Sequence, residues 1–267
     1  MSNSEAATEN REVIIYDIMA CNVYWDFENT PLNKEQHKFV ISLHPTPGIE
    51  TPELIESIRV TGPDGYEASI SNQKQNNVNR DGWIYDPSLN YYWYMMNTNN
   101  GFMKAGEYTV TITCKDGSVV TRSRIQDDSA SQAVLDAYIN NRDTIFNSFT
   151  PSEQNPLSPE SPLKHIVANW KTTKDVAGVD TFNVLRIGEA STSLEFDTQN
   201  LAWWDNIFMQ RVYNNDPLAG QNRNEVTIAA ELKPATSYGY FIETIDSNVQ
   251  GETNICILQP HHFFTTP

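Results

Sequence analysis

Cysteines, glycines and long apolar runs are scarce in this chain, and each scarcity excludes a class of protein. The three cysteines, Cys21, Cys114 and Cys256, are too few for a disulfide scaffold, and they form no CxxC pair for zinc or redox chemistry. The 12 glycines include no Gly-rich phosphate loop. Because no apolar run reaches about 18 residues, we expect no segment to span a membrane.

Motifs of catalysis and metal binding are also missing. The chain has no GxSxG elbow and no HExxH pair, so no motif identifies a nucleophile for hydrolase chemistry. Its 34 acidic residues are scattered, and nothing in the sequence brings two of them to one cleft. The adjacent His261 and His262 would point to opposite faces of a strand and cannot share an ion. We therefore predict no enzyme activity, no metal and no cofactor.

Charge and length narrow the remaining classes. The formal net charge of −16 opposes binding to nucleic acid or to an anionic membrane. Hydrophobic residues make up 39% of the 267-residue chain, enough for two domains of about 100 to 130 residues each.

Residues Ser2 to Ala6 lack the basic start and the apolar core of a signal peptide. Either the protein is cytoplasmic or a leader has been removed, and residues 1–12 are expected to form a flexible tail.

Residues 13–126 carry the signals of a β-domain. Short β-branched or aromatic runs end in turns, and Gly62 to Gly65 has the chemistry of a hairpin turn. Gly106 to Cys114 alternates apolar and polar residues, which predicts that Tyr108, Val110, Ile112 and Cys114 face a core. This pattern, followed by a tight turn, resembles the penultimate strand of immunoglobulin-like domains.

Two interpretations of the cysteines stay open at this point. Cys21 and Cys114 form a disulfide within the first domain and leave Cys256 unpaired, or all three are small buried thiols.

Residues 127–163 read as a connection between two domains. Ala130 to Phe149 is the one convincing helix, and the Asp and Ser residues before it are suited to cap its start. Pro151 to Pro162 contains four prolines, which cannot continue a helix or enter a central strand. We expect a stiff linker and a domain boundary here.

Residues 164–267 resemble a fibronectin type III domain. Ile166 to Trp170 reads as strand B with Trp170 pointing inward, and Thr181 to Ile187 reads as strand C. Leu232 to Tyr238 matches the family's LxPxTxY turn, in which the resemblance implies that the Tyr hydroxyl bonds back to the backbone. Phe263–Pro267 resembles the usual end of strand G in that family. One departure is Leu194 to Arg223, which is longer than the family allows between strands C and E.

Two aromatic groups are the candidate ligand-binding residues. They are Tyr91, Tyr92, Trp93 and Tyr94 in the first domain, and Trp203 and Trp204 in the long insertion. Strand neighbours point to opposite faces, so one pair of the first group belongs to the core and the other is exposed or at an interface. Exposed flat rings would suit the faces of sugars. The tryptophan pair, placed in a loop, would dock on the neighbouring domain or on a partner.

These observations predict an all-β fold of two tandem β-sandwich domains, immunoglobulin-like and then fibronectin type III-like, joined by one helix and the Pro-rich linker. Such tandem sandwiches resemble adhesin, lipoprotein and cell-wall modules, which implies a non-catalytic structural or binding protein outside the cytoplasm. Its partner would be a protein or glycan at a cell surface or matrix, and its leader is absent from this chain. One alternative is a carbohydrate-binding module or accessory protein of a polysaccharide-degrading system. Another is a filament or assembly subunit whose strand edges or tail complete a neighbour's sheet.

Overall fold

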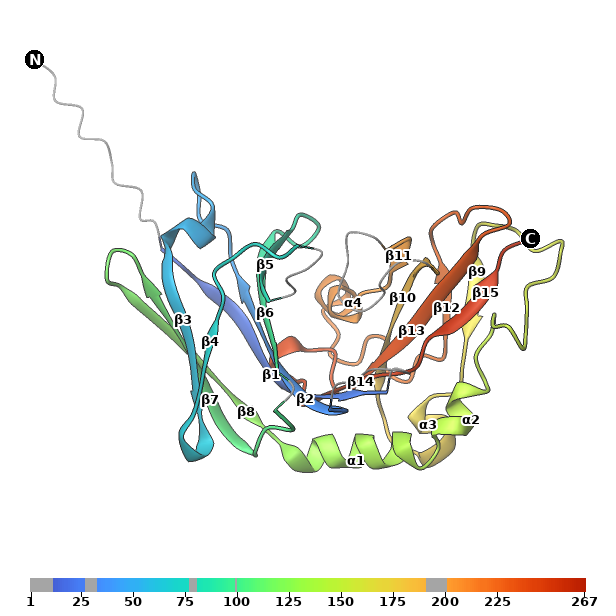
Figure 1. Cartoon of the computed structure of the whole chain (residues 1–267), viewed down its shortest axis with the longest axis horizontal. Coiled ribbons are helices and arrows are strands. Elements are labelled where there is room, and N and C mark those ends of the chain that lie inside the picture. Colours follow the sequence, from blue (N-terminus) through green and yellow to red (C-terminus); the bar gives the residue numbers. More distant parts are fainter. Residues whose placement is uncertain (1–11, 27–32, 77–80, 99, 191–200) are drawn as a thin grey trace, which may run out of the picture. The chain divides into compact units, whose positions relative to one another are not determined.

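The computed structural model of the chain describes residues 12–26, 33–76, 81–98, 100–190 and 201–267 (Figure 1). Strands dominate these residues, so the predicted all-β class is confirmed. The expected tail at 1–12, apart from its last residue, and residues 194–200 of the insertion lie outside the described residues. No helix in the described ranges is long and apolar enough to cross a membrane.

The chain divides into two compact units that alternate along the sequence. Unit 1 contains Met1–Ile18, Phe39–Met96 and Glu107–Arg124, whereas unit 2 contains Met19–Lys38, Asn97–Gly106 and Ile125–Pro267. The sequence predicted consecutive domains at 13–126 and 164–267. The difference arises because strands β1 and β2 each pass from one unit into the other.

Unit 1 is built from two groups of strands. One has the antiparallel order β4-β3-β7-β8, and the other has the order β2-β6-β5. The bounds are β1 Ile15–Trp25, β2 Glu35–Leu43, β3 Ile55–Gly62, β4 Tyr66–Ile70, β5 Gly82–Asp86, β6 Tyr91–Thr98, β7 Gly106–Cys114 and β8 Val119–Gln126, with short 3-10 turns at Thr51–Leu54 and Pro63–Gly65.

The two groups meet through aromatic rings. The ring of Phe39 on β2 lies 5.9 Å from that of Tyr66 and 5.7 Å from that of Tyr108, both of which belong to the other group. The alternating residues of β7 are buried as predicted, from Tyr108 to Cys114. The predicted hairpin turn is confirmed as well, because β3 pairs with β4 from Gly62 and Tyr66 outward. Asp64 and Gly65 supply the positive φ angles of 55° and 75° that close this turn.

Unit 2 contains a second sandwich. One of its sheets consists of β9 and β12. The other has the strand order β11-β10-β13, and the remaining edge of β13 pairs with both β14 and β15. β14 also runs parallel to the last residues of β1. The bounds are β9 Ile166–Asn169, β10 Phe182–Glu189, β11 Trp203–Trp204, β12 Glu225–Ile228, β13 Ser237–Ile245, β14 Ile255–Leu258 and β15 His262–Thr265, with a 3-10 turn at Gln250–Glu252.

The tyrosine corner implied by the fibronectin type III resemblance is present in unit 2. The backbone N–H of Lys233 donates to the Tyr238 hydroxyl over 2.9 Å. Tyr238 and Trp170 are both buried and belong to the same hydrophobic core. Trp170 follows the last residue of β9 and still points inward as expected. The core and the corner agree with a fibronectin type III-like sandwich.

The helical segment belongs to this core and is not part of a linker. The predicted helix is divided into α1 (Asp128–Ile139) and α2 (Arg142–Phe146), and Asp127 caps α1 by accepting from the N–H groups of Ser129 and Ala130. Its apolar face packs against the strands of unit 2, which corrects the expected connection at 127–163. The residues that it contributes to the core are Val134, Leu135, Tyr138, Ile145 and Phe149.

Only the proline segment of that connection keeps the predicted irregular structure, with Pro156, Pro159 and Pro162 exposed. Its first proline is anchored, since the Tyr240 hydroxyl donates to the carbonyl of Pro151. Two further helices are α3 (Thr173–Ala177) and α4 (Ile207–Asn214).

We predict that Tyr238→Phe lowers the free energy of unfolding by about 1–2 kcal/mol, because the Lys233 N–H loses its acceptor. Urea denaturation measures this difference. Tyr213→Phe on α4 is the matched control, since Tyr213 is 68% exposed and should tolerate the change. Equal stability of the Tyr238→Phe variant and the wild type would contradict a role for the corner.

Candidate functional site

The aromatic strand β6 presents different residues to its two faces. Tyr92 and Tyr94 are buried, whereas Tyr91 and Trp93 are half-buried. Tyr94 is 0% exposed and its hydroxyl donates to the Asn72 side chain over 2.7 Å. The predicted division of the strand is therefore confirmed. As a correction, Tyr92 and Tyr94 are core residues with almost no ring surface left for a ligand.

The other face of β6 carries a cluster of rings from three strands or their ends. Tyr91 stacks on Tyr16 of β1 with centroids 4.7 Å apart and planes inclined by 20°. His44, which follows β2, meets both rings edge-on at 5.1 and 5.2 Å. Trp93 lies two residues beyond Tyr91 on the same face. We call Tyr16, His44, Tyr91 and Trp93 the β6 aromatic face.

All four members of the β6 aromatic face retain partial exposure. Partial burial and the neighbouring Tyr16 raise the pKa of Tyr91, so its phenol is neutral at physiological pH. Asp86 lies opposite Tyr91 in the β5–β6 register, and its carboxylate accepts from the N–H and the hydroxyl of Ser88. The surface combines flat rings, a hydroxyl and a carboxylate, which can stack on and hydrogen-bond to a ligand.

Sequence reasoning missed Tyr16 and His44 as members of this surface. Tyr16 ends a β-branched run and His44 follows another, so both read as ordinary strand residues. Their contact with Tyr91 depends on which strands become neighbours, and no local pattern specifies that.

Trp203 and Trp204 form a short strand, which corrects the exposed loop expected there. They pair with Ile187 and Arg186 of β10. Trp203 packs against the core of unit 2, while the guanidinium of Arg186 lies 5.3 Å from the centre of the Trp204 ring. Both rings are half-buried, so less of their surface is free than an exposed loop would offer.

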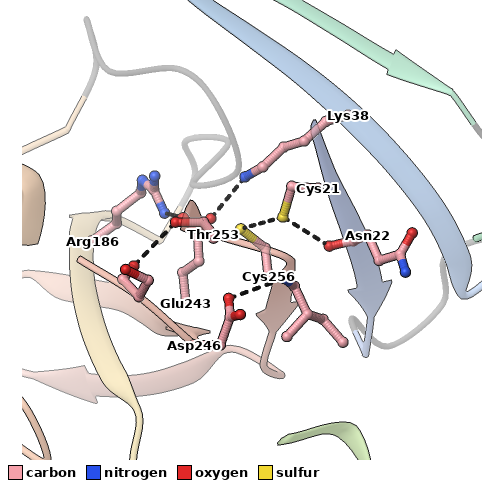
Figure 2. A network of polar contacts seen from close by, with 10 residues as sticks. Cys21, Asn22, Lys38, Arg186, Glu243, Asp246, Thr253 and Cys256 are labelled. Atoms are coloured by element: carbon pink, nitrogen blue, oxygen red, sulfur yellow. Dashed lines mark hydrogen bonds and ion pairs between the residues drawn. The ribbon is translucent and has the colours of Figure 1, made fainter. Parts of the chain in front are cut away.

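Arg186 also belongs to a buried ionic cluster in unit 2 (Figure 2). Glu243 on β13 accepts from Lys38 over 2.9 Å and also from Arg186. The Arg186 guanidinium lies between the rings of Trp204 and Phe241, at 5.3 and 5.5 Å. The carboxylate thus has two cations around it, and one of them is held in place by aromatic rings.

The cluster keeps its charges because its members compensate one another. Burial by itself raises the pKa of Glu243, but Arg186 and Lys38 reverse this and hold the pKa well below its usual value. Burial by itself lowers the pKa of Lys38, but Cys256 and Glu243 raise it above its usual value. Lys38 and Glu243 are therefore ionised at neutral pH, and their opposite charges hold strands β2 and β13 together.

All three cysteines are buried free thiols, which is the second of the two interpretations above. The alternative of a Cys21–Cys114 disulfide is therefore wrong, and the two residues belong to different units. The neighbour of Cys21 is Cys256, with the two Sγ atoms 3.5 Å apart. The pairing of β1 with β14 produces this contact, and the sequence gives no sign of it.

The two adjacent histidines serve in packing. His262 stacks on Phe149 with centroids 3.9 Å apart, whereas His261 meets Phe241 and Phe263. Burial lowers the pKa of His262 to about 3 and that of His261 to about 4. No group of three or more His, Cys, Asp or Glu side chains suited to a metal is found in the described ranges.

Comparisons with known proteins give no family assignment. No family model matches the chain, and no curated protein matches its sequence. Among solved structures, the 47-kilodalton lipoprotein Tp47 of Treponema pallidum aligns at 8% identity and a TM-score of 0.34, over 95% of this chain and 50% of that one. The chain thus spans about half the length of that lipoprotein.

Two fibronectin structures align with lower TM-scores. The FN1–FN3 domains of chicken CNTN1 align at 8% identity and 0.25, over 92% of this chain and 63% of that one. The fibronectin(III)-like modules of Clostridium thermocellum CbhA align at 8% identity and 0.24, over 93% and 94%. With scores this low, the fold assignment rests on this chain's own sheets, core and tyrosine corner.

We predict that Glu243→Gln lowers the free energy of unfolding by about 3–5 kcal/mol, because two buried cations lose their counter-charge. Chemical denaturation measures the loss. Glu189→Gln is the control, since its carboxylate pairs with Lys233 at the surface and its removal should leave stability nearly unchanged. Similar stabilities of both variants would show that the ionic cluster is not an anchor.

We also predict an acid-dependent loss of stability caused by the histidines. Their folded pKa values lie below the unfolded value of 6.5, so the unfolded chain binds protons more readily. The contribution of the two neutral histidines to the free energy of unfolding is fully present above pH 6.5. It decreases toward pH 3, by up to roughly 1.4 kcal/mol per pH unit for each histidine. Denaturation between about pH 6.5 and 5 measures this effect where carboxylates with ordinary pKa values of about 4 remain ionised.

His262→Phe should make this dependence less steep and keep the stacking on Phe149. Burial also lowers the pKa values of His261 and His37, so these two residues account for the pH dependence that remains in the variant. If the variant and the wild type lose stability equally between those pH values, His262 is not the source.

Proposed function

We propose that the chain is a non-catalytic binding module that works outside the cytoplasm and contacts its partner through the β6 aromatic face. The observation that supports this most is the placement of Tyr16, His44, Tyr91 and Trp93. Their rings gather on one sheet face of unit 1 and remain partly exposed, although the same strand sends Tyr92 and Tyr94 into the core. The resemblance of the second half to fibronectin type III modules supports this compartment.

Pre-organisation favours this surface as a binding site. Tyr16 and Tyr91 are stacked and fixed by strands, so holding them against a ligand costs little additional conformational entropy. Tyrosine, tryptophan and histidine also combine apolar ring faces with polar edges, as binding surfaces require.

Trp203 and Trp204 are the second proposed contact. Their rings already contact the core of unit 2 and Arg186, and this occupies part of the surface that a partner would use. The partner of the whole module is a protein or a glycan at a cell surface or matrix.

A carbohydrate ligand is the second candidate function, and the flat Tyr16–Tyr91 stack favours it. Sugar rings pack on aromatic faces, and the neighbouring Asp86 can accept from sugar hydroxyls. In this case the chain is a carbohydrate-binding module or an accessory protein in polysaccharide breakdown.

We predict that Tyr91→Ala combined with Trp93→Ala weakens binding about tenfold or more, since truncation removes the ring faces that a partner would cover. Binding is measured to whole cells, to matrix proteins and to a glycan array. Tyr85→Ala is the matched control, because Tyr85 is 43% exposed and lies on the neighbouring strand with its side chain toward the other face.

The array separates the two candidates. A glycan signal that the double variant loses and Tyr85→Ala retains supports the carbohydrate function, whereas loss restricted to protein partners supports adhesion. Unchanged binding by a correctly folded double variant would refute the β6 aromatic face as the contact surface.

A further inference from the structure

Two of the three cysteines touch inside unit 2 (Figure 2). Cys21 on β1 and Cys256 on β14 have their Sγ atoms 3.5 Å apart, and both side chains are buried. They lie 235 positions apart in the sequence, so the contact is a product of the fold. We propose that Cys21 and Cys256 are a site of reversible disulfide formation that joins β1 covalently to β14.

The strand register supports this cross-link and explains its reversibility. Asn22 pairs with Ile255 and Val23 with Cys256, so Cys21 lies two positions before the residue opposite Cys256. The two sulfurs therefore meet diagonally across a pair of strands. Closing the gap from 3.5 Å to a bond of about 2.05 Å requires side-chain rotation and a small shift of the strands. A disulfide that requires such a shift is more easily reduced than a relaxed one.

The surroundings of Cys21 slow its oxidation in the folded protein. Burial and the contact with Cys256 raise the pKa of the Cys21 thiol, while Lys38 acts in the opposite direction. Thiolates carry out disulfide exchange, so the buried Cys21 thiol, with its raised pKa, reacts slowly in the folded protein. The bond consequently forms during folding or local opening, when an oxidant gains access.

The reaction balances with a disulfide oxidant such as oxidised glutathione. One cysteine thiolate attacks the glutathione disulfide, forms a mixed disulfide and releases one glutathione thiolate. The second cysteine thiolate attacks the sulfur of the first and releases the other glutathione. The two protons lost by the cysteines pass to the two glutathione thiolates, and two electrons reduce the oxidant.

Cys114 provides an internal control. It ends β7 and is buried in unit 1, while Cys21 and Cys256 belong to unit 2. A specific cross-link leaves Cys114 as a free thiol. The bond forms whichever ligand the β6 aromatic face binds, so its failure and that of the proposed function are distinguishable.

The test refolds the full chain in buffers with graded ratios of oxidised to reduced glutathione. After free thiols are alkylated, non-reducing digestion and mass spectrometry should recover the Cys21 and Cys256 peptides linked, with Cys114 alkylated. The oxidised protein should also unfold at a temperature higher by roughly 5 °C or more, because the bond restricts the unfolded chain. Reduction should reverse both changes.

Cys114→Ala should keep the linked peptide, and Cys21→Ala or Cys256→Ala should lose it. The wild-type peptide map decides the question even where a variant fails to fold. The proposal is overturned if Cys21 and Cys256 are alkylated separately at every glutathione ratio, or if the recovered bond contains Cys114.

Discussion

The carboxylate of Glu243 is buried in the middle of a sheet, and its charge has to be compensated where it lies. A buried ion without a partner is too costly for a fold of ordinary stability to tolerate. Arg186 reaches it from the neighbouring strand β10, and Lys38 reaches it from β2, which lies 205 positions away in the sequence. The position of Lys38 in unit 2 is therefore an electrostatic requirement as much as a matter of packing. It ties an early part of the chain to a sandwich formed mostly by the last half.

This requirement shows why the domain boundary could not be read from the sequence. Lys38 begins an apolar run that looks like one more strand of the first domain, and Phe39 onward does belong to unit 1. The last residues of β1 pair in parallel with β14. Parallel pairing over such a separation leaves no turn or local periodicity to recognise. The contact of Cys21 with Cys256 depends on the same pairing and was equally invisible.

Features with a local cause were predictable. The alternation in β6 and β7, the turn at Gly62–Gly65, the cap at Asp127 and the tyrosine corner all depend on residues a few positions apart. The helix shows where local evidence ends. Its existence and its start follow from the sequence, but Leu135 and Tyr138 pack into the sandwich core, and nothing local distinguishes that from a helix in a linker. For the candidate site, the sequence identified Tyr91 and Trp93 but not Tyr16 or His44.

The aromatic residues illustrate how the fold assigns different roles to similar side chains. Tyr92 and Tyr94 fill a core, Trp204 positions a guanidinium beside a buried carboxylate, and Tyr91 stacks at a partly open surface. The first two roles are fully explained by packing and electrostatics within the chain. The Tyr91 stack is different, because partly exposed rings gain less from burial than core rings do. A partner that covered these rings would remove their remaining apolar surface from water without having to order them first. For that reason we propose the β6 aromatic face as the surface on which a partner binds.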